Sequence, residues 1–121
     1  MYPLKKKAKK RTEQKIQNAI VKMLKYRGWF VKRIIGNALQ SGMPDLFACH
    51  SSYGMRLIEV KDPNRKGDVF TAAQHINFPK ITDNGGIIHV LVAATEEEYQ
   101  KLFEPSNWVF YTSIWKNRRT K

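Results

Sequence analysis

The sequence contains one cysteine and three histidines. A single thiol, Cys49, cannot form an intramolecular disulfide, which favours a reducing compartment, and its place in an apolar run predicts a buried side chain. His50, His75 and His89 are scattered without the spacing of zinc ligands. We therefore expect neither a disulfide framework nor a zinc centre.

Long hydrophobic stretches are also missing. No run of about 18 apolar residues occurs, so the sequence predicts no transmembrane helix. The N-terminus is basic but lacks the apolar segment of a secretory signal. Together with the single cysteine, these absences predict a cytoplasmic protein of one modest domain.

Acidic residues are scarce. The 22 Lys and Arg residues outnumber the 10 Asp and Glu residues, which gives a formal net charge of +12 over 121 residues. Such a charge attracts polyanions, so nucleic acid or an anionic membrane surface is the expected partner. Much of it lies at the two ends, in Lys5, Lys6, Lys7, Lys9, Lys10 and Arg11, and in Lys116, Arg118, Arg119 and Lys121.

These basic ends predict a division of the chain into a basic arm (1–11), one domain (12–115) and a basic tail (116–121). Both ends could contact phosphates. Each phosphate neutralised on duplex DNA would steepen the salt dependence, with the binding constant falling by about 0.9 log units more per log unit of salt concentration. Solubilising tails or a nuclear-import signal are the alternatives.

Periodicity and turn residues predict an α/β domain. The first helix is expected to start at a Thr12 cap, with Glu13 in its first turn, and to end near Gly28. Its apolar stripe comprises Ile16, Ala19, Ile20, Met23 and Leu24. The following segments are expected as strands at 29–35, 45–49, 55–61 and 87–93, and as helices at 71–82 and 95–103. Residues 108–115 are aromatic and predict an edge strand or a partner-contacting surface.

Three residues of the central hairpin carry the chemistry. Glu59 and Lys61 are two apart on a predicted strand and therefore point to the same face. Asp45 can meet them if its strand pairs with theirs. Two carboxylates and a fixed ammonium in an apolar sheet predict a divalent-metal site acting on a phosphodiester, because unpaired charges there would be costly. A solvated edge pair is the alternative.

Other residues before and after this group could act in the site or in the fold. Glu13 falls beside the apolar stripe of the first helix, where it could reach the site or be a plain first-turn acid. Thr71 and Gln74 match a capping box, which predicts a structural role for Gln74. Arg65 and Lys66 follow the acid-x-lysine motif directly and could grip a substrate backbone.

The order and spacing of these residues resemble the VRR-NUC (virus-type replication-repair nuclease) family of the PD-(D/E)XK nuclease superfamily. The likeness covers roughly residues 12–93. It rests on Glu13, on residues 41–46 (SGMPDL), on residues 58–61 (IEVK) and on Thr71-x-x-Gln74.

The resemblance implies a restriction-endonuclease-like α-β-β-β-α-β core with a central mixed sheet flanked by helices. It also implies that Asp45, Glu59 and the Val60 carbonyl bind Mg²⁺ or Mn²⁺, with Glu13 joining through a water molecule. Lys61 would position or activate the attacking water, and Gln74 would line the site. Stand-alone members of viral or bacterial origin are similar in size and act as homodimers on branched DNA, including four-way junctions.

Several readings remain open at this point. The leading hypothesis is a metal-dependent DNA endonuclease that acts on branched DNA as a homodimer. A non-catalytic basic DNA-binding protein or a ribosome-associated basic protein explains the charge but not an acid pair among apolar residues. Within the enzyme class, an archaeal-type junction resolvase or a flap or restriction-like nuclease is the nearest competitor.

Overall fold

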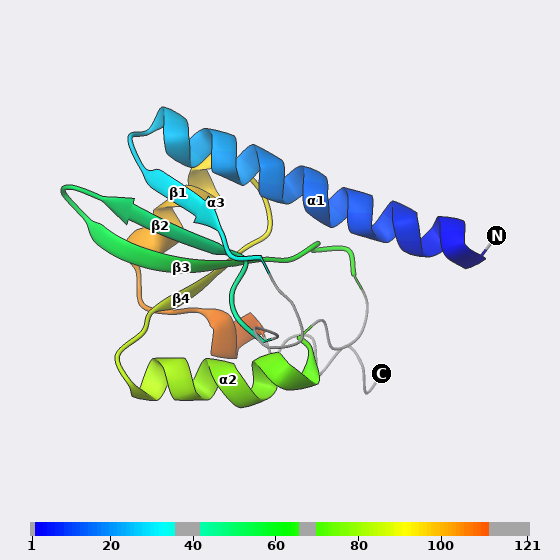
Figure 1. Ribbon diagram of the computed structural model, residues 1–121. Coiled ribbons are helices and arrows are strands. Elements are labelled where there is room, and N and C mark those ends of the chain that lie inside the picture. Colours follow the sequence, from blue (N-terminus) through cyan, green and yellow to red (C-terminus); the bar gives the residue numbers. More distant parts are fainter. Residues whose placement is uncertain (1, 36–41, 66–69, 112–121) are drawn as a thin grey trace.

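The computed structural model describes residues 2–35, 42–65 and 70–111, with side chains from Thr12 onward. A long helix, α1 (Tyr2–Tyr26), leads into a four-stranded sheet, as Figure 1 shows. The helix begins ten residues before the predicted Thr12 cap. The basic segment therefore continues α1 as a helix, and Glu13 lies in the middle of that helix rather than in its first turn.

The sheet has the strand order β1-β2-β3-β4. Its strands are β1 (Phe30–Arg33), β2 (Leu46–His50), β3 (Gly54–Val60) and β4 (Ile88–Leu91). The first three strands form an antiparallel meander, whereas β3 and β4 are parallel. The α2 helix (Ala72–Asp83) connects β3 to β4, so the predicted strand–helix–strand crossover and the mixed sheet are both confirmed.

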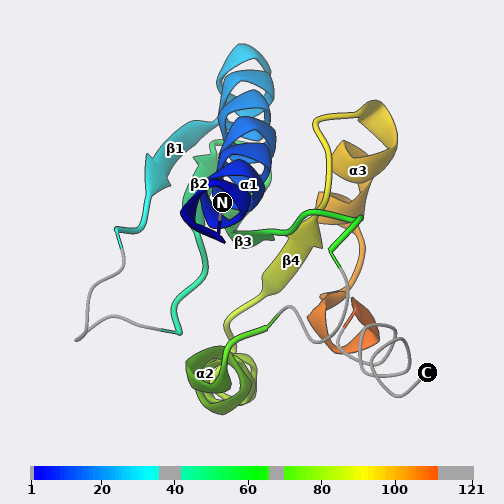
Figure 2. The ribbon, with the colours of Figure 1, turned by 90° about the vertical axis from the view of Figure 1, so that its right-hand side faces the viewer.

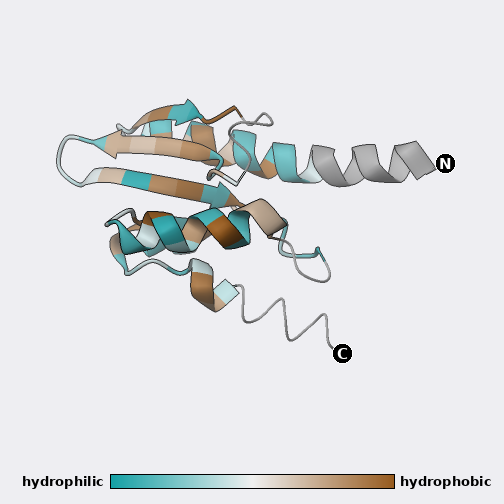
Figure 3. Cartoon of the chain, turned by 60° about the horizontal axis from the view of Figure 1, so that its bottom comes forward, coloured by the Kyte–Doolittle hydropathy of each residue, from teal (hydrophilic) through white to brown (hydrophobic). Residues whose placement is uncertain are grey.

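Helices cover both faces of the sheet, which explains why β2, β3 and β4 are largely apolar, whereas β1 carries Lys32 and Arg33. Figure 2 shows α1 and α3 (Glu96–Gln100) on one face and α2 on the other. On the α1 face, Ile20 and Leu24 pack against the strands. On the α2 face, Phe78 is fully buried against Ile88. The hydrophobic character of the strands is visible in Figure 3. The predicted stripe of α1 is largely right, although Ala19 is exposed and Val21 is buried in its place.

The start of α2 carries the predicted capping box. The Thr71 side chain accepts a hydrogen bond from the Gln74 amide, and the Gln74 side chain accepts one from the Thr71 amide. Gly42, at φ +87°, packs against this same helix, since a Cβ there would lie 2.6 Å from the Ala73 carbonyl oxygen. The segment that leads into Asp45 is thereby docked on α2.

Two short helical segments follow β4. After Thr95, α3 is followed by the 3₁₀ helix η1 (Lys101–Phe103). The Thr95 hydroxyl caps α3 by accepting from the Glu98 amide, whereas the Glu98 carboxylate accepts from the Val92 amide. Residues 108–111 are helical, which contradicts the predicted edge strand there. Trp108 is buried against Phe78, and the remainder of that prediction, 112–115, lies outside the described residues.

Two smaller expectations are also decided by the fold. Cys49 was expected to be buried. It is a free thiol of intermediate exposure near the C-terminal end of β2, next to the turn that leads into β3. Among the described residues, no helix is long and apolar enough to cross a membrane.

Candidate active site

A pocket of about 340 Å³ lies where the ends of β2 and β3 meet α1 and the start of α2. The sequence-predicted residues Glu13, Asp45, Glu59, Lys61, Arg65 and Gln74 all line it, together with Gln14, Gln17 and Thr71. Residues separated by more than 60 positions therefore meet at one end of the sheet, at the carboxyl end of β3.

Glu59 and Lys61 form the centre of the pocket. Extending the β2–β3 register by one residue places Asp45 opposite Glu59, because Leu46 pairs with Ile58. Lys61 continues the strand, since its amide donates to the Leu91 carbonyl. Its Nζ lies 3.0 Å from Glu59 Oε2, and both side chains are almost fully buried. The prediction that these two side chains share one face of the sheet is correct.

Gln74 links this ion pair to helix α2. Its Nε2 donates to Glu59 Oε2 over 2.8 Å, and its Oε1 accepts from Lys61 Nζ over 3.3 Å. The same Oε1 also accepts from the Thr71 amide over 3.1 Å. The capping box therefore does more than start a helix: it holds one amide side chain against both catalytic candidates. Gln74 therefore lines the pocket, as the family resemblance implied, in addition to its structural role in the cap.

The Asp45 side chain contacts the backbone of β3. Its Oδ2 accepts a hydrogen bond from the Val60 amide over 2.7 Å. Burial raises the pKa of this carboxyl, and the Val60 hydrogen bond only partly opposes the increase. The role of the Val60 carbonyl as a metal ligand stays a prediction.

The Glu59 carboxyl is the most perturbed acid of the pocket. Burial first, and then the Asp45 carboxylate, raise its pKa to about 7, even though Lys61 and Gln74 favour the charged form. Two neighbouring carboxylates repel each other, so burial side by side makes the ionised form of Glu59 costly. Perturbed acids of this kind cluster at functional sites.

Glu13 reaches the rim of the pocket from the middle of α1. Its Oε2 lies 3.6 Å from Arg65 Nη1, in an ion pair between α1 and the loop that follows β3. Burial raises the pKa of the Glu13 carboxyl, opposed by the positive charges of Lys61 and Arg65. Of the two predicted alternatives, the pocket-facing position is therefore correct and the first-turn position is wrong.

The donors fit a hard divalent cation. Glu59 Oε1 is buried beside the Asp45 carboxyl, and among the described residues no N–H or hydroxyl group donates to it. Among the described residues, no group of three or more His, Cys, Asp or Glu side chains is placed to hold a metal ion. Two carboxylates are nevertheless enough for Mg²⁺, which binds through one or two carboxylates and keeps several waters.

Three lining residues were not singled out as site residues from the sequence. Gln14 and Gln17 follow Glu13 on α1, and Thr71 was assigned to capping alone. The signal for the two glutamines was present, because residues three and four apart share a helix face and Glu13 marks the pocket side. Uncharged amides carried no chemical reason to choose them.

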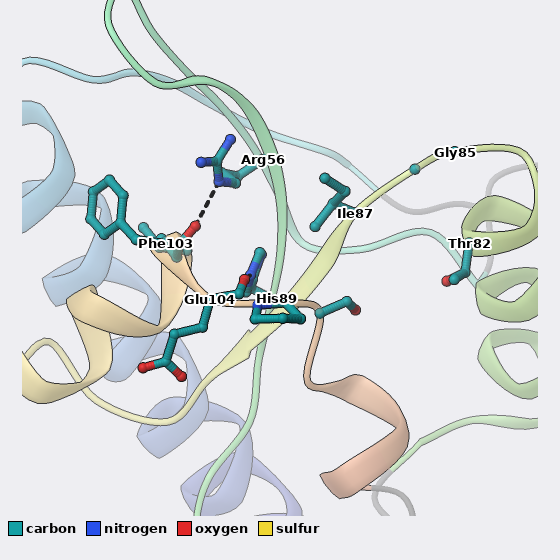
Figure 4. Close-up of a pocket in the computed structure, with 11 residues that line it drawn as sticks. Arg56, Thr82, Gly85, Ile87, His89, Phe103 and Glu104 are labelled. Carbon is teal, nitrogen blue, oxygen red and sulfur yellow. Dashed lines mark hydrogen bonds between the residues drawn. The ribbon is translucent and has the colours of Figure 1, made fainter.

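A second hollow, of about 420 Å³, lies away from these residues (Figure 4). It is lined by Arg56, Ile87, His89 and Phe103, among others. The Arg56 guanidinium is engaged by backbone, since Nε donates to the Leu102 carbonyl over 2.8 Å. Burial lowers the pKa of His89, and its Nε2 contacts the Glu104 carbonyl. No pair of neighbouring acids lines this hollow, so it does not offer the same chemistry.

The predicted DNA-contacting residues are placed unevenly. Arg65 lies at the pocket rim, with 45% of its side chain exposed. Lys5, Lys6, Lys7, Lys9, Lys10 and Arg11 belong to α1, but their side chains lie outside the described part of the structure. Lys66, Lys116, Arg118 and Arg119 also lie outside the described residues.

Comparison with known proteins identifies the fold. A solved structure described as a VRR_NUC domain matches with a TM-score of 0.61 and 19% sequence identity. The match covers 77% of this chain and 96% of that one. No protein-family model matches, and no match was found among curated proteins. The mixed four-stranded sheet between helices, formed by this sequence, is the fold of a VRR_NUC domain.

Proposed function

We propose that this protein is a metal-dependent DNA endonuclease of the PD-(D/E)XK type, within the VRR-NUC family. The observation that carries the proposal is the buried group of Glu59, Lys61 and Gln74, with Asp45 opposite, inside a chain of net charge +12. Buried acids weaken phosphate binding unless a cation reverses the local sign. A site that holds a cation explains why a polyanion-binding molecule keeps them.

The proposed cofactor is Mg²⁺, with Mn²⁺ as a substitute. Asp45 and Glu59 would hold it, with the Val60 carbonyl and a water-mediated contact from Glu13 completing the site. When bound, the ion supplies a positive centre that polarises a phosphoryl oxygen and acidifies water. Its oxygen ligands would come from two adjacent strands, on which the backbone hydrogen bonds keep the carboxylates in register.

Lys61 would be the main catalytic side chain besides the metal ligands. Its ammonium is held by Glu59 Oε2 and Gln74 Oε1, which fixes a donor at the pocket wall. From there it can orient the attacking water and donate to the phosphate oxygens as their charge increases. Gln74 keeps this donor in place and holds Glu59 in one orientation. Because the side chains of this pair are almost fully buried, each of these interactions is stronger than it would be in water.

The proposed substrate is branched DNA, with the four-way junction as the first choice. Symmetric cleavage of such a junction needs two active sites on opposed strands, and one chain supplies one pocket. A homodimer is therefore part of the proposal. Val109 and Phe110 are exposed apolar side chains and are therefore the candidates for a dimer interface in this region. The neighbouring Trp108 is buried in the core and is not available for such a contact.

A non-catalytic DNA-binding protein is the second candidate, because net charge alone favours it equally. It gives no reason for Glu59 Oε1 to be buried without an N–H or hydroxyl donor among the described residues. A flap or restriction-like nuclease of the same superfamily would use the same pocket and differ in substrate.

A Mg²⁺ titration of cleavage tests the proposal, using duplex, flap, splayed-arm and four-way junction DNA. We expect cut products that require the metal and are lost in Glu59→Gln and Asp45→Asn, while both variants still bind DNA. The matched control is Glu97→Gln, which removes an exposed acid from α3. Cleavage by Glu59→Gln at the wild-type rate would refute the site, and a cut of every substrate at the same rate would refute the preference for branched DNA.

A further inference from the structure

The pocket-facing side of α1 carries an amide side chain whose orientation is determined by a neighbour. Gln17 lines the pocket, and its Oε1 accepts a hydrogen bond from Arg33 Nη1 at the end of β1. The other arm of the guanidinium, Nη2, donates to Asn18 Oδ1 over 2.8 Å. Gln14 Nε2 donates to the same Asn18 oxygen over 3.1 Å.

The contact with Arg33 decides which of the two terminal atoms of the Gln17 amide, Oε1 or Nε2, faces the guanidinium. A guanidinium has only donors, so the atom that faces Arg33 must be the Gln17 oxygen. The Nε2 group is then directed away from Arg33. Neither of its two N–H groups has a hydrogen-bond partner among the described residues. The side chain is only partly buried, so these donors are accessible.

Arg33 is not used for an ion pair. Its guanidinium is exposed and contacts two amide oxygens, with no carboxylate partner among the described residues. Planar guanidinium groups bind two acceptors in a fixed fork, which makes them suited to orient a neighbouring group. A cation placed beside the pocket also makes that side of it attractive to phosphate.

We propose that Gln17 is a substrate-binding residue, and that it donates from Nε2 to a non-bridging phosphate oxygen of the DNA strand in the pocket. Arg33 is its positioning residue. Because Arg33 engages the Gln17 oxygen, the rest of the amide offers N–H donors, which suit a phosphate, whose oxygens accept. The inference rests on the proposed nuclease function and adds to it a contact on the α1 side, opposite the α2 side that Gln74 occupies.

The test compares Gln17→Glu with Asn18→Asp. Both add the same charge to adjacent residues of α1, and both keep an acceptor for Arg33. Only Gln17→Glu replaces an amide that lines the pocket with a carboxylate, because Asn18 does not line the pocket. Affinity for a labelled four-way junction and for duplex DNA is measured by fluorescence anisotropy with and without Mn²⁺. Single-turnover cleavage is measured at rising enzyme concentration.

We expect Gln17→Glu and Gln17→Ala to raise the dissociation constant and the half-saturating enzyme concentration about tenfold, the size of one lost hydrogen bond to a charged group. The rate at saturation should stay within about twofold of wild type. Asn18→Asp should change affinity about twofold. An equal loss in Gln17→Glu and Asn18→Asp, or a loss confined to the saturated rate, overturns the proposal.

A double-mutant cycle tests the role of Arg33. Arg33→Met should weaken DNA affinity severalfold in the wild-type background and clearly less in the Gln17→Ala background, because one part of its effect acts through Gln17. Equal effects in both backgrounds overturn the positioning role. If the wild type binds DNA but never cuts it, the proposed function fails, whereas the affinity comparison still decides whether Gln17 contacts DNA.

Discussion

Lys61 Nζ lies 3.0 Å from Glu59 Oε2, and neither side chain has more than 4% of its surface exposed. A pair buried this deeply is weak evidence of stabilisation, because desolvation of two charges offsets much of their attraction. The same oxygen accepts from Gln74, while no N–H or hydroxyl group of the described part of the chain donates to the other carboxylate oxygen. This difference between the two Glu59 oxygens is better explained by a metal-binding role of Oε1 than by a contribution to folding stability.

Lys61→Met should reduce cleavage by at least about 100-fold, the usual loss when one preorganised donor to a developing charge is removed. DNA affinity should change little, since Lys61 is one cation among 22 basic residues. The control is Lys32→Met, which removes an exposed lysine from β1 and should leave cleavage near wild type. A similar fall in both variants would assign the effect to net charge.

The pH dependence of stability provides a test without DNA. Glu59 has a folded pKa of about 7 against an ordinary value of 4.5. Between these values the folded state binds more protons than the unfolded state. The free energy of unfolding therefore decreases as pH rises from 4.5 to 7, on the order of 3 kcal/mol for this group.

Urea denaturation of metal-free protein across pH 4.5–8 measures this slope. Glu59→Gln should be less sensitive to pH than wild type, because the glutamine does not ionise. The pKa of buried His89 is lowered, which contributes a slope of opposite sign, so the comparison is the difference between the two proteins. Parallel curves for wild type and variant would show that Glu59 ionises normally.

Divalent metal should stabilise the folded protein at pH 8, where both acids can ionise. At a metal concentration of about 100 times the dissociation constant, the gain is about 2.7 kcal/mol. Thermal unfolding with Mn²⁺ should show it in wild type and in Glu97→Gln, and not in Asp45→Asn or Glu59→Gln. Equal stabilisation of all four proteins would place the metal elsewhere.

The cap of α2 should matter for activity as well as stability. Thr71→Val removes the hydroxyl that accepts from the Gln74 amide, at a cost of about 1 kcal/mol. Because the anchored Gln74 holds Glu59 and Lys61, cleavage at saturation should fall about tenfold. Thr95→Val removes the corresponding hydroxyl from the cap of α3 and should lose comparable stability with cleavage unchanged. Loss of activity in both variants would point to general destabilisation.

Gly42 should tolerate alanine poorly. Its φ of +87° disfavours any side chain, and a Cβ would lie 2.6 Å from the Ala73 carbonyl oxygen of α2. Gly42→Ala must therefore displace the segment that carries Asp45, and we expect it to destabilise the fold by about 2 kcal/mol and to weaken metal binding. Gly85 has nearly the same φ with nothing within 4 Å, so Gly85→Ala isolates the backbone strain. Chemical denaturation of the two variants compares them, and equal losses would remove the role of the contact with α2.

Local patterns in the sequence were sufficient for much of the site. The period of two places Glu59 and Lys61 on one face, and the capping box of Thr71 and Gln74 is a contact between residues three apart. The order of strands and helices follows from similarly short-range signals. Such features depend on backbone geometry and neighbouring side chains, so they are readable before the chain folds.

Other features were decided only in three dimensions. The α1 helix extends back to Tyr2 through a run of like charges that predicted a basic arm. Trp108 is buried between α2 and β4, although its segment predicted an edge strand or a partner-contacting surface. Gln74 reaches Glu59, Glu13 pairs with Arg65, and Arg33 donates to the Gln17 side-chain oxygen. Each of these contacts joins residues at least fifteen positions apart. Packing of helices on the sheet selects such partners, and no periodicity along the chain records them.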